Sequence, residues 1–341
     1  MHQIISHALS SFELGEAQIH ANMTIVPVLV PNGCGPDYLT MREALDAGVL
    51  AVTEVSEGGS VPNLKVSNKS DKPVLLLDGE EVAGAKQNRV LNTTILVKER
   101  SEVVIPVSCT EQGRWTYATR DFYDSGNIMA RNIRMSKNQS VSASYLVTNA
   151  ARSDQGAIWN EINQMAHDAG APSQTGAMKD VYEKRQEELN DYLQAFRLVA
   201  GQKGLMVFIG GAPAAAVGFD CLSLERAFAG LFPKLVKSYA MEAWLEGRKK
   251  KGKAEGAGAE SGGKNGAGDI AKAFLAEAAA CEEKSYDSVG MGKDYRYSGL
   301  RLVGSALAVE DAVIHMAFFR VTETEQAGNM AGMNRRRSFR V

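Results

Sequence analysis

The stretch Asp78-Gly79-Glu80-Glu81, followed closely by Lys86-Gln87-Asn88-Arg89, decides how the first half of this chain is interpreted. Apolar runs typical of strands flank it at residues 73–77 and 90–97. A solvated loop would also be polar, but it is usually richer in Ser, Pro and Gly and is not enclosed by core strands. We therefore predict that residues 78–89 connect adjacent strands and form the lip of a pocket.

Working outward, the sequence alternates short apolar runs with polar turns. The candidate strands of the first half are residues 22–30, 49–55, 64–67, 73–77, 93–97 and 102–109. A short helix at 41–47, capped by Thr40, is expected between the first two. Strands at this spacing favour an antiparallel sheet, sandwich or small barrel.

The second half is richer in helical patterns. The expected helices are residues 128–146, a helix capped by Ser153, and residues 176–200, 223–229, 233–245 and 270–281. Hairpins are expected from 204–210 with 215–219 and from 300–309 with 313–321. Residues 121–127 have the composition of a loop. We therefore predict an α+β fold, in which an antiparallel β-rich N-terminal part packs with a helical and hairpin C-terminal part.

The length of 341 residues is typical of about two domains. We expect a β-rich part at residues 1–150 that carries the site, and an α+β part at 151–321. Residues 247–268 contain many glycines and no large apolar residue, as in a flexible insert. The basic tail at 322–341 is expected to be disordered.

Composition excludes several classes of protein. The net charge of −2, from 38 basic and 40 acidic residues, makes a general nucleic-acid binder unlikely. The four cysteines are widely spaced and favour a reducing compartment. The start has no signal-peptide pattern, and no window approaches the ~18 apolar residues of a membrane span. We expect a soluble cytoplasmic protein without a membrane partner; the oligomeric state stays open.

Carboxylates are the first candidate chemical groups. Glu80 and Glu81 point to opposite faces of an extended chain, so only one can easily face a given pocket. Together with Asp78 and Glu111, that residue could hold Mg²⁺ through oxygen ligands or act as a general base. The alternative is a turn with solvent-facing acids.

Donor groups follow directly. Lys86 could act as a point charge on a phosphate, and Arg89 could bind phosphate or carboxylate oxygens in a two-pronged fashion. Gln87 and Asn88 could orient a ligand. These bases could equally be ion-pair partners of Glu80 or Glu81, and an internal ion pair can also preorganise a site.

A third candidate element directly follows the strand that ends at Cys109. In the run Glu111-Gln112-Gly113-Arg114-Trp115, Arg114 could bind a phosphate and Trp115 could stack on an adenine ring. The alternative is a core tryptophan beside a surface charge. Cys109 lies in an apolar strand and is expected to be inert. No histidine, Rossmann or Walker pattern indicates zinc or a known nucleotide loop.

Several segments in order resemble the ARPP family, proteins associated with ADP-ribosylglycohydrolase and rhodanese-phosphatase genes. These segments are Asp78-Gly79-Glu80-Glu81, Gly84-Ala85-Lys86-Gln87-Asn88-Arg89, Asn92-Thr93, Ile105-Pro106-Val107, Gly113-Arg114-Trp115, Ser153-Asp154-Gln155-Gly156, Thr175-Gly176, Phe219-Asp220, Pro233-Lys234-Leu235, Ser238-Tyr239-Ala240 and Gly304-Ser305-Ala306. The resemblance covers about residues 12–321 and implies an α+β domain that acts in NAD or ADP-ribose metabolism. The glycine-rich insert and the basic tail are departures from the family pattern.

The resulting hypothesis is a hydrolase-like enzyme that processes ADP-ribose or a related nucleotide. Glu80 or Glu81 would be the general base or a metal ligand. The remaining residues expected at the site are Lys86, Gln87 and Asn88 beside the reacting group and Arg89, Asn92, Glu111, Arg114 and Trp115 on the ligand. The alternatives are a non-catalytic nucleotide-binding module and an interaction scaffold.

Overall fold

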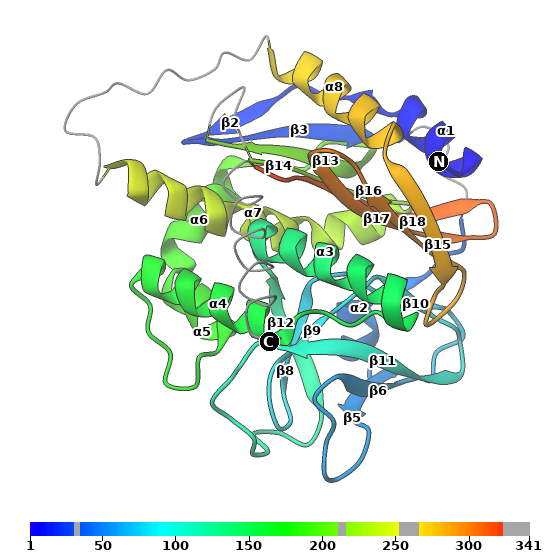
Figure 1. Ribbon diagram of the computed structural model, residues 1–341, viewed down its shortest axis with the longest axis vertical. Helices are drawn as coiled ribbons and strands as arrows, with labels where there is room; N and C mark the ends of the chain where they lie inside the picture. The colour runs from blue at the N-terminus through cyan, green and yellow to red at the C-terminus, as the bar shows by residue number, and fades with distance from the viewer. Residues whose placement is uncertain (31–34, 211–215, 252–265, 323–341) are drawn as a thin grey trace, which may run out of the picture.

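The computed structural model describes residues 1–30, 35–210, 216–251 and 266–322. Its fold is α+β, as predicted, with mainly antiparallel sheets packed against helices (Figure 1). The helices are α1 (Gln3–Ser11), α2 (Met41–Asp46), α3 (Arg131–Thr148), α4 (Gln155–Ala169), α5 (Met178–Lys184), α6 (Gln186–Ala195), α7 (Glu225–Lys251) and α8 (Ala267–Ala279). The strands are β1 (Glu13–Leu14), β2 (Gln18–His20), β3 (Met23–Leu29), β4 (Leu39–Thr40), β5 (Leu50–Glu54), β6 (Asn63–Asn68), β7 (Val74–Leu76), β8 (Glu80–Gly84), β9 (Arg89–Leu91), β10 (Ile95–Val97), β11 (Ser101–Cys109), β12 (Phe122–Ile128), β13 (Gln202–Ile209), β14 (Ala216–Leu222), β15 (Glu282–Asp287), β16 (Lys293–Ser298), β17 (Leu302–Val309) and β18 (Ala312–Arg320).

The longest sheet joins the two ends of the chain. Its strand order is β1-β3-β13-β14-β18-β17-β16-β15, and β2 also pairs with β3. Strand β3 lies antiparallel to β13, with Val26 opposite Met206. The expected division near residue 150 therefore does not coincide with the sheets, because β1–β3 belong to the sheet formed mostly by the second half.

Both faces of this sheet are covered. Leu205 and Val207 of β13 pack in one core with α7, whereas Met206 and Phe208 pack in a second core with α1 and α8. The alternation follows from the two-residue period of a strand. Figure 1 shows α8 and α1 on one side of the sheet and α7 and α3 on the other. The continuous apolar runs predicted as buried strands thus contribute side chains to two cores, one on each face of the sheet.

The remaining strands form a second β layer. A six-stranded sheet, β12-β8-β9-β11-β6-β5, and a three-stranded sheet, β10-β7-β4, share a third apolar core. The helix α2 next to them begins with a capping box, in which Thr40 and Glu43 satisfy each other's backbone N–H groups. This layer holds every acid and base that the sequence placed at the pocket lip.

Two segments expected to be loops are strands. The interval 78–89 contains β8, whose five residues are all buried between β9 and β12. Residues 121–127 lie largely in β12. Both segments were predicted as loops because their side chains are polar. In both strands, buried ion pairs and hydrogen bonds take the place of the usual apolar contacts. The run 90–97 is correspondingly split into β9 and β10.

The helices also differ in detail. Helix α7 continues through Pro233, although a break was expected there. Its apolar stripe, which includes Phe228, Leu235 and Tyr239, is fully buried, and this packing outweighs the lost backbone hydrogen bond. Residues 176–200 form two helices, which meet at Arg185. Strands β15 and β16 were not predicted.

Some expectations fall on residues that lie outside the described ranges. The middle of the glycine-rich insert, 252–265, and the basic tail from 323 onward are among them. Within the described ranges, no helix combines the length and the apolar character needed to cross a bilayer.

Candidate functional site

The Asp78-Gly79-Glu80-Glu81 stretch lies in the interior, at the entry to β8. Gly79 has φ +84°, and a Cβ atom on it would lie 2.9 Å from the Arg134 side chain. Glycine is therefore required here for both conformation and space. The flanking carboxylates are all buried, so each needs a partner, and those partners decide what it can do.

Glu80 is engaged by a lysine of α7. Lys234 Nζ lies 2.7 Å from Glu80 Oε1 and 2.7 Å from Asp124 Oδ2. Burial raises the pKa of Glu80. Burial also opposes ionisation of Asp124, but the attraction of Lys234 outweighs it and lowers the pKa of Asp124. Glu80 thus serves a buried ion-pair group that joins β8, β12 and α7.

Glu81 has a different environment. The Thr110 hydroxyl donates a hydrogen bond to Glu81 Oε1 at 2.6 Å, whereas Oε2 accepts none within the described part of the chain. Burial raises the pKa of Glu81 to about 7. Glu80 and Glu81 therefore serve different clusters, as the alternation of a strand requires.

Asp78 lies in a third place. It accepts a hydrogen bond from Lys137 of α3, and Arg134 Nε lies 3.7 Å from its other oxygen. The carboxylates considered for Mg²⁺, namely Asp78, Glu80 and Glu111, are thus each paired with a different cation. Across the described ranges, no group of three or more His, Cys, Asp or Glu side chains is placed to hold a metal ion. The structure does not assemble the expected magnesium ligands.

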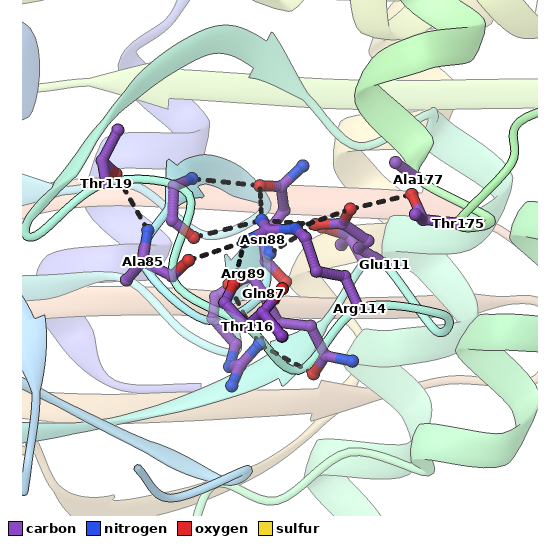
Figure 2. Close-up of polar contacts among 12 residues, drawn as sticks. Ala85, Gln87, Asn88, Arg89, Glu111, Arg114, Thr116, Thr119, Thr175 and Ala177 are labelled. Atoms are coloured by element: carbon purple, nitrogen blue, oxygen red, sulfur yellow. Dashed lines mark hydrogen bonds and ion pairs between the residues drawn. The ribbon is translucent and has the colours of Figure 1, made fainter. Parts of the chain in front are cut away.

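Glu111 and Arg114 do come together, as Figure 2 shows. Arg114 donates from Nε to Glu111 Oε1 at 2.9 Å and from Nη2 to Oε2 at 2.6 Å. Thr175 and the Asn88 backbone N–H also donate to this carboxylate. Burial opposes its ionisation, but the hydrogen bonds from Arg114, Thr175 and the Asn88 N–H, with the charge of Arg114, together outweigh it and lower the pKa of Glu111. Both oxygens are committed, so this pair shapes the loop after β11.

Asn88 and Gln87 hold the neighbouring backbone and side chains in place. Asn88 Oδ1 accepts from the Gly84 N–H at 3.0 Å and from Arg114 at 3.2 Å (Figure 2). Gln87 Oε1 accepts from Arg89 Nη1 at 3.0 Å. These two amides therefore orient arginines. Asn92 lies elsewhere, since its side chain bonds Ala151 and Ser108 and its carbonyl accepts from Lys137.

Lys86, Arg89 and Trp115 lie close together. Trp115 is 43% exposed, and Lys86 Nζ and the Arg89 guanidinium lie 5.6 Å and 5.5 Å from its ring. Tyr117 is 51% exposed and lies 5.1 Å from Lys86 Nζ. Arg89 itself is fully buried. An exposed aromatic ring with two cations close to it is suited to a flat, anionic ligand.

Glu54, at the end of β5, was not among the site residues predicted from the sequence. Its Oε1 lies 3.9 Å from Arg89 Nη2. Neither oxygen of Glu54, and neither Nε nor Nη2 of Arg89, makes a hydrogen bond within the described residues. Glu54 also lines a cavity of about 890 Å³ with Tyr117. We call Glu54, Lys86, Arg89, Trp115 and Tyr117 the Trp115 cluster.

Gly59 explains how the Trp115 cluster comes together. A Cβ atom on Gly59, whose φ is +76°, would lie within 3.3 Å of Lys86, Trp115 and Glu54. The only available sequence signal was Glu54 at the end of a predicted strand, followed by the turn residues Glu57-Gly58-Gly59. Cys109 lies nearby, and burial raises the pKa of its thiol to about 11, in keeping with the inert role expected.

A buried charge network on α3 was also missed. Arg134 donates to both oxygens of Asp220, at 3.0 and 2.8 Å, and Tyr239 donates to the same carboxylate at 2.6 Å. Arg131 pairs with Glu242. The signal was three cations, Arg131, Arg134 and Lys137, at three-residue spacing on one helical face.

We compared the sequence with models of known protein families. Residues 11–319 match the model of the ARPP-1 domain, described as the ARG and Rhodanese-Phosphatase-superfamily-associated Protein domain. The chain belongs to this family, as the resemblance indicated. No curated protein and no solved structure matched it. The family's name associates it with ADP-ribosylglycohydrolase and rhodanese-phosphatase proteins, which suggests a link to ADP-ribose metabolism.

Proposed function

We propose that the Trp115 cluster binds ADP-ribose or a related phosphorylated nucleotide and that the protein hydrolyses it. The observation that carries the proposal is the exposed Trp115 ring with two cations, Lys86 and the buried Arg89, within 5.6 Å of its centre. The family's association with ADP-ribose metabolism supports the choice of ligand.

The chemistry of such a ligand matches the cluster. An adenine ring stacks on an exposed indole, and each stacked base contributes about 1–3 kcal/mol. Lys86, which donates to the Gly58 carbonyl at 2.9 Å, can exchange that bond for one to a phosphate oxygen. Glu54 and Arg89 are buried, and neither oxygen of Glu54 nor Nε or Nη2 of Arg89 makes a hydrogen bond within the described residues. If ligand binding opens this pair, a ribose hydroxyl can donate to Glu54 and accept from Arg89.

Hydrolysis needs a base to accept a proton from the attacking water. Glu54 suits this role best, because neither of its oxygens makes a hydrogen bond within the described residues, its ion pair with Arg89 is long at 3.9 Å, and the residue lines the cavity. Glu80 is bound to Lys234 and Glu81 to Thr110, and neither residue lines that cavity. We therefore assign the base to Glu54 in place of the two glutamates favoured by the sequence.

The test is a fluorescence titration of the full chain with ADP-ribose, NAD, AMP and ribose 5-phosphate, followed by product analysis. Stacking on Trp115 should quench its emission, and Trp115→Phe should remove that component while Trp159 and Trp244 still emit. Glu54→Gln should retain binding and lose turnover. Quenching unaffected by Trp115→Phe would contradict the proposed binding surface. Binding without turnover in the wild type would contradict the proposed hydrolysis and favour the alternative of a non-catalytic nucleotide-binding module.

A further inference from the structure

A second cavity lies between α3 and the strands β15 to β17, away from the Trp115 cluster. Its volume is about 580 Å³, within the size range of small-molecule sites. One wall comes from Ser142 and Leu146 of α3 and another from Tyr286 of β15. The floor includes Arg296 of β16, which is 4% exposed.

Arg296 lines this cavity and has two donor atoms without a hydrogen-bond partner among the described residues. Its Nη2 donates to Asp294 at 2.7 Å and to Thr93 at 2.6 Å. Its Nε and Nη1 are buried and make no hydrogen bond within the described part of the chain, and the same is true of the Ser142 hydroxyl. Burial works against the charge, but Asp294 outweighs it and raises the pKa of Arg296. The floor therefore carries a permanent cation whose hydrogen-bonding capacity is only partly used.

A second cation stands beside it. Lys284 of β15 is the cross-strand partner of Arg296, so both side chains lie on the same face of the sheet. Like charges directly opposite one another destabilise a sheet. Asp294 offsets the charge of Arg296 at 2.7 Å, and an anion bound between the two cations would reduce the remaining repulsion. Lys284 also lines the cavity. Glu282 is the acidic residue of the lining, two positions along β15.

The rest of the wall is apolar. Leu302 and Val303 line the cavity from β17, and Leu146 and Leu300 are 58% and 93% exposed. The Tyr286 ring stacks on Tyr145 at 4.3 Å, and Arg296 lies 5.3 Å from the Tyr145 ring. An occupant therefore needs an apolar or aromatic body as well as an anionic group.

We propose that this cavity is a binding site for a small organic anion, a carboxylate or phosphate monoester with an aromatic or aliphatic body. The anionic group lies between Arg296 and Lys284 and accepts from the Ser142 hydroxyl. The apolar body lies against Leu302, Val303 and Leu146. This site is independent of the proposed nucleotide site, since the two share no residue.

The test uses phenyl phosphate and benzoate as probes on the full chain. Phenol, which lacks the anionic group, and inorganic phosphate, which lacks the apolar body, are the matched control compounds. Saturation-transfer NMR should detect at least one of the two probes, with phenol and phosphate binding at least about tenfold more weakly. Lys284→Glu should weaken the probe by about tenfold or more. Lys272→Glu, an exposed lysine on α8 across the sheet, is the matched control and should have no effect.

Ser142→Trp, which fills the cavity from α3, should also abolish probe binding and does not depend on removing a buried charge. Absence of binding by both anionic probes, or binding that survives both Lys284→Glu and Ser142→Trp, would overturn the proposal. A probe that binds at the Trp115 cluster instead would survive both changes, so failure here is distinguishable from failure of the proposed function.

Discussion

At the scale of single residues, two buried carboxylates of the second β layer, Glu81 in β8 and Glu111 just after β11, have pKa values shifted in opposite directions. Glu111 keeps its charge because Arg114, Thr175 and a backbone N–H hold it. Glu81, with one hydrogen bond from Thr110, has a pKa raised to about 7. Glu111 is therefore kept ionised with the help of its ion pair with Arg114, whereas burial of Glu81 favours its neutral form.

The pH dependence of Glu81 follows from this. Its pKa is higher in the folded protein than in the unfolded chain, so the folded state holds the proton more tightly and stability is lost as pH rises from about 4.5 to 7. Glu81→Gln removes this loss. We expect the variant to be more stable than the wild type at pH 8, by up to about 3 kcal/mol, and nearly equal to it at pH 5. Urea unfolding at both pH values measures the difference.

Glu111→Gln is the matched comparison and should behave in the opposite way. The pKa of Glu111 is lowered in the folded protein, so its stabilisation is present above the unfolded value and is lost as pH falls through the folded one. The variant should be less stable than the wild type at pH 8, by about 1–3 kcal/mol. Equal pH profiles for the two variants would refute this account of both residues.

At the scale of elements, α3 is organised by its cations. Lys137 and Arg134 enter the interior from one helical face and meet Asp78 and Asp220. Removing one partner of a buried pair leaves an uncompensated charge, which costs about 3–5 kcal/mol. The helix is thus fixed to both β layers by charge as well as by Ile133 and Val141.

Lys137→Met tests this role. It should lower the free energy of unfolding by about 3–5 kcal/mol, because Asp78 loses its nearest cation. Adding Asp78→Asn should restore part of the loss, since the remaining partner is then neutral. Calorimetry on the two variants, with the exposed-site variant Lys272→Met as control, measures this. A loss below about 1 kcal/mol would show that the pair is unimportant.

The sequence predicted elements best where burial is apolar. The hairpin β17–β18 and the capped helix α2 follow their patterns closely. The sequence-based prediction failed at β8 and β12. Both strands are rich in Glu, Asp, Ser, Asn or Gly, a composition typical of loops, and only their ion-pair partners show that they are buried strands. Those partners, Lys234 above all, lie more than a hundred residues away, and no local rule could supply them.

The candidate site shows the same limit of local patterns. The sequence grouped Lys86, Arg89 and Trp115 because their residue types suit an anionic, aromatic ligand. The structure places both cations within 5.6 Å of the Trp115 ring, and their role in binding stays a prediction. Glu54 was missed because its relation to Arg89 arises only when β5 and β9 enter one sheet. Sequence reasoning grouped Asp78, Glu80 and Glu81 because they are neighbours in the chain. In the structure, strand alternation and long-range ion pairs place them in three separate clusters.

At the scale of the molecule, the N-terminal strands complete the sheet of the second half. Val26 and Val28 of β3 fill one core beside β13, and Ile25 fills the other. Without β3, the edge of β13 and apolar surface on both faces would be exposed.

A fragment of residues 151–341 should therefore not fold alone. We expect it to lack a cooperative thermal transition by circular dichroism, whereas the full chain shows one. Adding residues 1–30 to the fragment as a separate peptide should restore some structure. A cooperative transition in the fragment by itself would show that β3 is dispensable.

The central claim is that the Trp115 cluster binds an ADP-ribose-type nucleotide. Isothermal titration of ADP-ribose into the full chain and into Trp115→Ala tests it most directly, with Tyr123→Ala, another exposed aromatic, as control. The account predicts saturable binding that Trp115→Ala weakens by about tenfold or more and Tyr123→Ala leaves unchanged. No binding to the wild type, or equal affinities for the wild type and Trp115→Ala, would contradict it.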